Sequence, residues 1–185
     1  MSNNNREIKI AISGKSGCGN TTVSRLIAEK LNLRFINFTF RTIALERGLD
    51  LEEIIEEAEK DEKWDREVDH RQVALAREEG GCVLGSRLAI WMLPEADLKV
   101  FLAAKLETRA GRIQKREGGD LKEIMDFTEY RDNQDSCRYK RIYNLDHDNY
   151  AFVDLVIETD DLDPTQISDI IVNKIQEKLS QEQAK

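Results

Sequence analysis

Cysteine, proline and aromatic residues are scarce in this sequence of 185 residues, which has three cysteines, two prolines and 6% aromatic residues. The cysteines lie far apart and form no Cys-x-x-Cys pair, so neither a disulfide framework nor a zinc site is expected. Cys18, Cys82 and Cys137 are therefore expected to be reduced thiols. The sequence has no Pro/Ser-rich linker, repeat or low-complexity tract, and its length suits one domain with a substantial core.

Long apolar runs are also absent. No stretch reaches the roughly 20 residues that a bilayer span requires. The N-terminal residues 1–7 lack the apolar segment of a signal peptide. These absences predict a cytoplasmic protein without a membrane partner.

Acidic residues outnumber basic ones by 36 to 28, which gives a formal net charge of −8. This balance disfavours passive adhesion to nucleic acid or to an anionic membrane. The charge is uneven, because residues 1–49 and 105–141 carry +5 and +2, whereas 50–70 and 142–185 carry −8 and −7. An anionic ligand is therefore expected to bind locally, in the basic stretches.

Apolar runs of strand length alternate with segments of helical periodicity along the chain. The expected strands lie at 7–13, 34–37, 82–84, 98–102 and 153–157. The expected helices lie at 21–31, 39–47, 50–60, 65–78, 105–117, 120–145 and 164–180. Such alternation is typical of parallel sheets that helices cover on both faces. The sequence therefore predicts a three-layer α/β fold with a five-stranded parallel sheet.

A glycine-rich loop follows the first expected strand and precedes the first expected helix. It matches the pattern Gly-x-x-x-x-Gly-Lys-Ser/Thr, except that Asn20 occupies the lysine position. In such loops, backbone N–H groups and the helix N-terminus bind phosphate, and the Ser/Thr hydroxyl reaches Mg²⁺. We expect ATP on this loop and the metal at Thr21; the alternative is a glycine turn without a ligand. The expected ATP-binding residues of the loop are Gly14, Lys15, Ser16, Gly17, Cys18, Gly19, Asn20, Thr21 and Thr22.

The absence of a lysine at position 20 removes a cation from the β/γ phosphates. A preorganised charge there is worth about 3–4 kcal/mol in rate. Lys15 follows the first glycine, where some divergent loops carry an extra lysine. We expect Lys15 to act as the substitute catalytic cation; the alternative is a loop lysine that faces solvent.

Beyond the loop, the sequence resembles the short, archaeal-type cytidylate kinases of the nucleoside monophosphate kinase family, over about residues 7–178. The stretches that carry the resemblance are Phe40-Arg41, Ala44–Gly48, Val68–Gln72, Val83–Ala89, Pro94–Asp97, Arg112–Glu117, Arg138-Tyr139 and Tyr143–Asp146. The resemblance implies a P-loop fold and transfer of the ATP γ-phosphoryl group to CMP or dCMP with Mg²⁺. The resemblance implies a single domain with three parts. The core comprises 7–37, 80–104 and 150–180, the acceptor-binding helical insertion lies at about 38–79, and the lid lies at about 105–145.

Phosphoryl transfer depends on positioning and on neutralising charge, so arginines are the expected tools. The resemblance places Arg112 and Arg116 over the ATP phosphates, with Arg109 on the same helical face. The alternative for this set is a salt-bridged surface helix. The resemblance also places Arg41 and Arg87 on the monophosphate of the acceptor.

A second set, Arg131, Asp135 and Arg138, matches a pattern that cytidylate kinases use near the transferred phosphoryl group and the CMP phosphate and sugar. We expect the two arginines to be catalytic together with Lys15, and the whole set to bind CMP. Asp69 is expected to accept a hydrogen bond from the exocyclic amine of cytosine, which uracil lacks. The alternative for Asp69 is one more carboxylate on a solvated acidic helix.

The sequence departs from the family pattern at three places. Asn20 replaces the loop lysine, Gly85 stands where an acidic residue often closes the third strand, and residues 35–37 lack an Asp-Ser-Gly element. These departures leave open an inactive or weak nucleotide-binding module, or a kinase for another small acceptor such as UMP. The expected partners are small nucleotides and not nucleic acid, and the chain is expected to be a monomer. His70 and His147 are interpreted as bystanders.

Overall fold

The computed structural model describes residues 8–183, and its strands form one parallel sheet in the order β2-β3-β1-β4-β5. The central strands β1 and β3 are buried almost throughout, as is typical of strands covered on both faces. The predicted α/β fold with five parallel strands is confirmed. The strands are β1 (Lys9–Gly14), β2 (Arg34–Ile36), β3 (Cys82–Gly85), β4 (Leu98–Ala103) and β5 (Leu155–Glu158).

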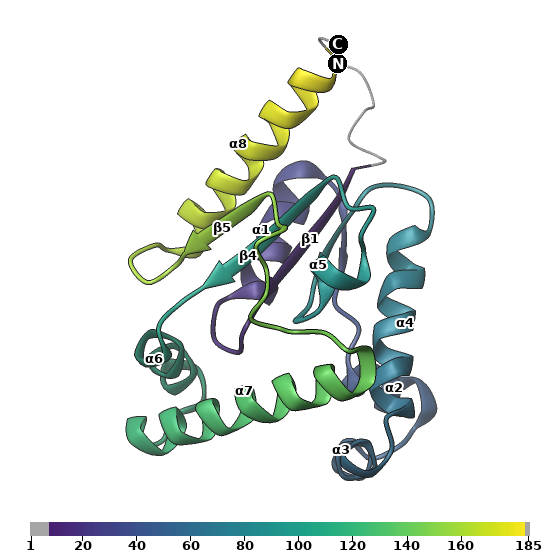
Figure 1. The fold of residues 1–185 in the computed structure, drawn as a ribbon, viewed down its shortest axis with the longest axis vertical. Coiled ribbons are helices and arrows are strands. Elements are labelled where there is room, and N and C mark those ends of the chain that lie inside the picture. The colour runs from purple at the N-terminus through teal and green to yellow at the C-terminus, as the bar shows by residue number, and fades with distance from the viewer. Residues whose placement is uncertain (1–7, 184–185) are drawn as a thin grey trace.

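Helices cover both faces of the sheet (Figure 1). On one face α1 and α8 pack together over a cluster that includes Ile12 and Ile171. On the other face α5 and the end of α4 bury a cluster that includes Leu84 and Ile90. In the described part of the chain, no helix is long and apolar enough to cross a membrane. The helices are α1 (Asn20–Leu31), α2 (Phe40–Arg47), α3 (Leu51–Lys60), α4 (Lys63–Arg77), α5 (Ala89–Met92), α6 (Leu106–Glu117), α7 (Leu121–Tyr143) and α8 (Pro164–Gln183).

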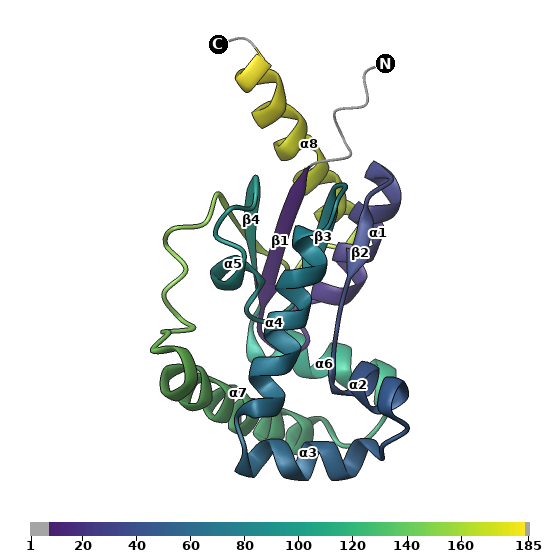
Figure 2. The same ribbon diagram turned by 90° about the vertical axis from the view of Figure 1, so that its right-hand side faces the viewer.

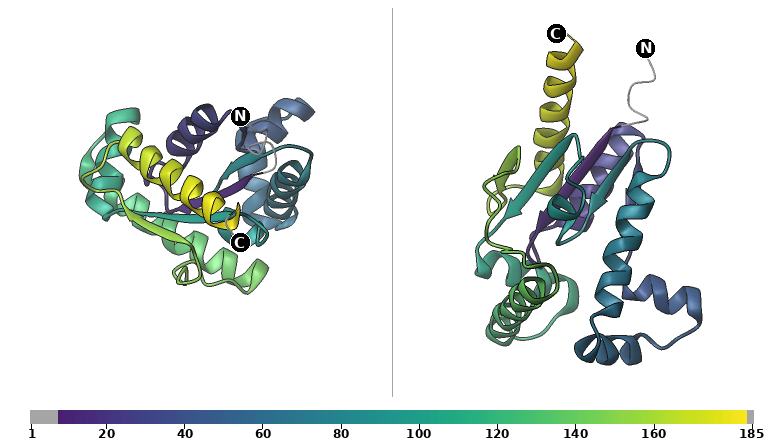
Figure 3. Two further views of the ribbon diagram at one scale, coloured as in Figure 1. Left: turned by 90° about the horizontal axis from the view of Figure 1, so that it is seen from above. Right: turned by 45° about the vertical axis from the view of Figure 1, so that its right-hand side comes forward.

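Two groups of helices extend beyond the C-terminal ends of the strands (Figures 2 and 3). Helices α2–α4 form an insertion between β2 and β3, with an apolar cluster of their own around Ile43, Ile54 and Trp64. Helices α6 and α7 pack against each other between β4 and β5. The carboxyl ends of parallel strands are where open α/β sheets bind ligands. The two groups therefore flank the expected location of the site.

Some boundaries differ from the sequence prediction. The strand expected at 153–157 is β5 (Leu155–Glu158), because the Asp154 carboxylate accepts a hydrogen bond from the Lys99 backbone N–H at 2.8 Å just before the ladder begins. The short helix α5 (Ala89–Met92) was not predicted, since four residues carry no periodicity. The first expected strand began at Glu7, which lies outside the described residues.

Candidate active site

A cavity of about 730 Å³ lies at the C-terminal ends of the strands. Its walls come from the glycine loop, the α2–α4 insertion and the α6–α7 pair. All nine predicted loop residues line it. Of the other predicted residues, six line it and two, Arg41 and Asp135, do not. The six are Asp69, Arg87, Arg112, Arg116, Arg131 and Arg138.

The glycines of the loop allow the chain to turn closely against its neighbours. A Cβ at Gly14 would lie 2.5 Å from the backbone oxygen of Leu102 on β4. Gly17 has a positive φ of 84°, and a Cβ there would lie 2.8 Å from the backbone oxygen of Arg109 on α6. The path of the loop is therefore fixed by contacts with β4 and α6.

The α1 N-terminus is exposed to the cavity. Its cap residue Gly19 supplies no side-chain hydrogen bond, and Asn20, Thr21 and Thr22 line the cavity. The first backbone N–H groups of a helix and its dipole favour a bound anion. This end of the cavity therefore has the features of a phosphate site.

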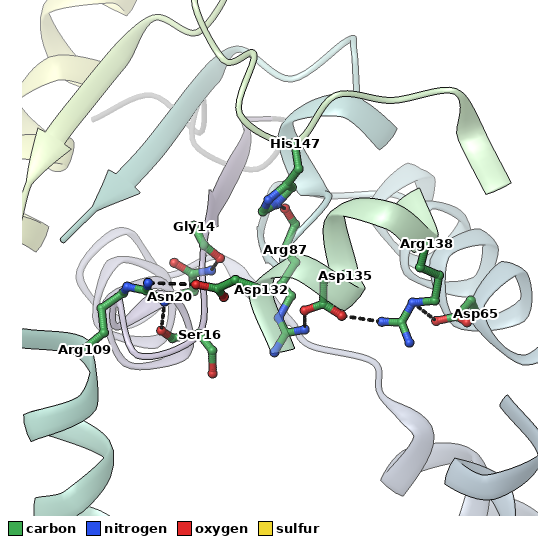
Figure 4. A network of polar contacts seen from close by, with 10 residues as sticks. All are labelled: Gly14, Ser16, Asn20, Asp65, Arg87, Arg109, Asp132, Asp135, Arg138 and His147. Atoms are coloured by element: carbon green, nitrogen blue, oxygen red, sulfur yellow. Dashed lines mark hydrogen bonds and ion pairs between the residues drawn. The ribbon is translucent and has the colours of Figure 1, made fainter. Parts of the chain in front are cut away.

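The side chain of Asn20 is directed to the loop backbone. Its amide nitrogen donates to the Gly14 carbonyl at 2.8 Å, and its oxygen is buried without a partner among the described residues (Figure 4). The amide carries no charge, so it cannot do for a phosphate what a lysine would do. Asn20 connects the beginning of the loop to the beginning of the helix.

Lys15 lines the same end of the cavity. Its ammonium group lies 2.7 Å from an Asp148 carboxylate oxygen, in the segment between α7 and β5. About 29% of the Lys15 side chain and 63% of the Asp148 side chain are exposed. An ion pair this exposed is worth at most about 1 kcal/mol, so a stronger anion can displace the carboxylate.

Two arginines of α6 donate hydrogen bonds to backbone carbonyls of the glycine loop. Arg109 is buried, donates to the Ser16 carbonyl at 3.0 Å and pairs with Asp132 of α7 at 2.7 Å (Figure 4). Arg112 donates to the carbonyls of Gly17 and Cys18, each at 3.4 Å. Arg109 and Arg112 therefore lie on one face of α6, as their spacing predicts, and their hydrogen bonds connect the α6–α7 pair to the glycine loop.

Arg116 and Arg131 are the exposed cations of this wall. The Arg116 guanidinium lies 2.6 Å from a Glu117 carboxylate oxygen, and 67% of its side chain is exposed. Arg131 lines both the main cavity and a smaller one of about 240 Å³ between α6 and α7. No hydrogen bond or ion pair in the described part of the chain occupies Arg131. Its charge is free to meet an anion.

The part of the cavity beside β3, α4 and α7 contains an alternating chain of charges (Figure 4). Arg87, which follows β3, forms an ion pair with the buried Asp135 of α7. The other Asp135 oxygen accepts from Arg138 at 2.7 Å, and Arg138 lies 3.5 Å from Asp65 of α4. Burial lowers the pKa of Arg87 and raises that of Asp65. Asp135 thus holds two arginines at the edge of the cavity without lining it.

Polar side chains of α4 line the opposite side. Asp65, Asp69 and Gln72 recur at i, i+4 and i+7, so they share one helical face, and all three line the cavity. The Tyr143 hydroxyl at the end of α7 donates to Asp69 at 2.7 Å. Burial raises the pKa of Asp69 to about 6, although this hydrogen bond acts in the opposite direction. This face presents hydrogen-bond acceptors opposite the arginines.

His147 has a structural position. It is 3% exposed, its Nε2 atom lies 3.1 Å from the Arg87 carbonyl, and its ring centroid lies 5.0 Å from that of Trp91. Burial lowers its pKa, which favours the neutral ring. His147 therefore supports the backbone of Arg87 and does not itself line the cavity.

Gly85 allows close packing between β3 and α1. A Cβ there would lie 2.4 Å from the Ser24 hydroxyl oxygen and 2.7 Å from the Ser24 Cβ. An acidic side chain therefore does not fit at this position beside Ser24. No group of three or more His, Cys, Asp or Glu side chains that could hold a metal ion exists among residues 8–183. The Thr21 hydroxyl is the remaining candidate metal ligand. A single protein ligand suits a Mg²⁺ ion that is held mainly by phosphates and water.

Arg41 lies outside the cavity. It is exposed at the beginning of α2, whereas the preceding residues 37–40 line the cavity. Sequence reasoning missed Asp65, Gln72, Asp132 and Asp148 as residues of or beside the site. The helical spacing of Asp65 and Gln72 with Asp69 was a signal that could have found two of them.

The family model described as "Cytidylate kinase-like family" matches residues 9–161. "Cytidylate kinase 2" of Borreliella afzelii is 45% identical over 175 residues, which cover 92% of this chain and 98% of that protein. "Cytidylate kinase" of Archaeoglobus fulgidus is 38% identical over 173 residues, covering 92% and 96%. "Cytidylate kinase" of Methanocaldococcus jannaschii is 41% identical over 172 residues, covering 90% and 96%.

Solved structures share the fold at low sequence identity. A shikimate kinase from Bacteroides thetaiotaomicron superposes with a TM-score of 0.61 at 21% identity, covering 94% of this chain and 98% of that one. A deoxyadenosine kinase from M. mycoides gives 0.58 at 16% identity, covering 91% and 100%. The fold, the glycine loop and the named relatives all point to the same family. The chain belongs to the cytidylate kinase-like family and is a nucleoside monophosphate kinase with a P-loop fold.

Proposed function

We propose that the protein transfers the γ-phosphoryl group of ATP to CMP, and to dCMP, and forms ADP and the corresponding diphosphate. One observation carries this proposal: a single cavity has a glycine loop at one end and, at the other end, arginines that face the hydrogen-bond acceptors of α4. CMP has the complementary polarity, because its phosphate is an anion and its cytosine has an exocyclic amine. Relatives named cytidylate kinase support the choice of acceptor.

ATP binds at the glycine loop in this proposal. Its β and γ phosphates accept hydrogen bonds from loop N–H groups and lie on the α1 N-terminus. The Thr21 hydroxyl would help to hold Mg²⁺, which would supply positive charge to neutralise part of the phosphate charge. Arg112 and Arg116 of the α6–α7 pair, which serves as the lid, cover the nucleotide.

CMP binds between α4 and α7, with the α2–α4 insertion as its binding element. Arg87 and Arg138 exchange the Asp135 carboxylate for the acceptor phosphate, which a guanidinium can bind through two N–H groups. Asp135, which lies behind the two arginines in this conformation, becomes accessible when they turn to the phosphate and then accepts from the sugar, and Asp69 accepts from the cytosine amine. Arg41 completes the phosphate site if α2 moves toward the cavity.

No general base is required, because the acceptor phosphate is already ionised. The protein positions the two phosphates in line and neutralises the charge that develops between them. Lys15 leaves Asp148 for the transferred phosphoryl group and supplies the cation that Asn20 lacks. Arg131 and Arg138 supply the remaining positive charge.

One observation favours a second candidate, a module that binds nucleotide without turnover. Asn20 is bonded to Gly14 and Lys15 to Asp148, so neither provides a free cation at the loop. Against it, Arg87, Arg131 and Arg138 all line the cavity, and a binding module has no need of three cations at the acceptor.

Release of ADP from ATP·Mg²⁺ with CMP, dCMP and UMP as separate acceptors tests the proposal. CMP and dCMP should be phosphorylated in preference to UMP. Binding of CMP in a calorimeter without ADP release would establish the module instead. A clear preference for UMP would remove Asp69 as the base reader.

A further inference from the structure

We infer that Gln72 is a second residue that reads the cytosine base, beside Asp69, and that its amide donates a hydrogen bond to the ring nitrogen N3. This inference rests on the proposed function. The observation behind it is an unsatisfied polar group. Gln72 lines the cavity and is only 4% exposed, yet its amide oxygen is buried and has no hydrogen-bond partner among residues 8–183.

A buried amide without a partner is costly in a folded protein. Buried side-chain polar atoms are nearly always paired, and one left unpaired costs about 1–3 kcal/mol. Exchanging the oxygen and nitrogen of the amide would leave a donor unpaired instead of an acceptor, so the orientation of the amide does not change this conclusion. A ligand group that enters the cavity would remove the cost.

The surroundings of Gln72 fit a flat base. Asp69 lies one helical turn earlier on the same face of α4, where residues three apart are neighbours. Val68, Phe38 and Phe40 line the same cavity and supply apolar wall. An apolar slot with two polar groups at one edge is suited to a ring whose hydrogen-bonding atoms lie along one side.

The chemistry of cytosine matches this pair of side chains. Its edge presents an amine with two hydrogens and, next to it, the acceptor N3. Asp69 accepts one amine hydrogen, the Gln72 oxygen accepts the other, and the Gln72 nitrogen donates to N3. Uracil presents a carbonyl and an N–H instead. An amide can turn to match that pattern, whereas a carboxylate cannot, so Gln72 provides affinity and Asp69 provides discrimination.

Two substrates that differ at one atom test the contact. With wild-type enzyme, 3-deaza-CMP, in which a C–H group replaces N3, should have a kcat/KM about tenfold below that of CMP. For the Gln72→Leu variant, the kcat/KM for CMP should fall about tenfold or more, and the kcat/KM for 3-deaza-CMP should equal that for CMP. The loss should appear mainly in KM.

Two controls separate base recognition from packing. Ribose 5-phosphate, which has no base, should inhibit wild type and Gln72→Leu equally. Gln134→Leu, on an exposed part of α7 outside the cavity, should leave all values unchanged. Wild-type use of 3-deaza-CMP within about twofold of CMP, or a Gln72→Leu loss shared equally by ribose 5-phosphate, would overturn the inference. Failure of wild type to phosphorylate CMP would instead overturn the proposed function.

Discussion

In the proposed reaction, the preference for CMP over UMP should depend on pH through Asp69. Burial raises the pKa of this carboxyl to about 6, and the carboxylate accepts from the cytosine amine more strongly than the protonated carboxyl does. Once protonated, Asp69 can donate to the uracil carbonyl instead. Acidification should therefore remove the preference for CMP.

The size of the effect follows from the pKa. With a value of about 6, about nine tenths of Asp69 is ionised at pH 7 and about one tenth at pH 5. The ratio of kcat/KM for CMP to that for UMP should fall at least about tenfold between these two pH values. Both substrates carry the same phosphate, so its own titration cancels in the ratio.

Variants of two residues make the prediction specific. Asp69→Asn should give a low ratio that does not change between pH 5 and pH 7, because the amide does not titrate over this range. Tyr143→Phe removes the hydrogen bond that lowers the Asp69 pKa, so the midpoint of the profile should move to higher pH. Steady-state kinetics of ADP release would measure all three profiles. A ratio that is constant with pH in wild type, or that still titrates in Asp69→Asn, would refute the reasoning.

Three further changes test the loop and its supports. Lys15→Ala should lower kcat about 100-fold or more in steady-state assays of ADP release, and an unchanged kcat would show that Asp148 merely holds a surface lysine. Gly85→Ala should lower the free energy of unfolding by about 1–3 kcal/mol in denaturant titrations, because its Cβ meets Ser24, and should cost less in a Ser24→Gly background; equal costs in both backgrounds would contradict the packing argument. Asp132→Asn should cost about 3–5 kcal/mol in the same titrations, since it leaves the Arg109 charge buried and unpaired, whereas a cost below about 1 kcal/mol would mean that water reaches the guanidinium.

The features that the sequence predicted well are local ones. The sheet follows from short apolar runs, and the glycine loop between β1 and α1 from glycines at fixed spacing before a helix. The helix starts expected at 50 and 120 also have a local basis, although the sequence analysis did not identify it: Asp50 and Asp120 cap α3 and α7 by accepting hydrogen bonds from backbone N–H groups two and three residues later. Each of these signals depends on neighbours in the sequence, so no tertiary information was needed.

The partners of the site residues were not predictable in the same way. Tyr143 and Asp69 are 74 residues apart in sequence. Arg109 was placed on an arginine face, but its partner Asp132 lies on another helix. Helical spacing says which residues share a face, not which face of another helix they meet. Arg41 shows the same limit, since its resemblance to a phosphate-binding arginine does not bring it into the cavity in this conformation.

Two departures from the family pattern, Asn20 and Gly85, are best understood together. A Cβ at Gly85 would lie 3.6 Å from the backbone oxygen of Asn20, so the two positions are neighbours. A lysine at the first and an acid at the second would carry opposite charges, and losing both leaves the local net charge unchanged. The Asn20 amide donates a hydrogen bond to the Gly14 carbonyl, and the lack of a side chain at Gly85 leaves room for Ser24. Neutral contacts therefore occupy both positions in this chain, and in the proposed reaction the cation for phosphoryl transfer comes from Lys15 and Arg131, which line the cavity.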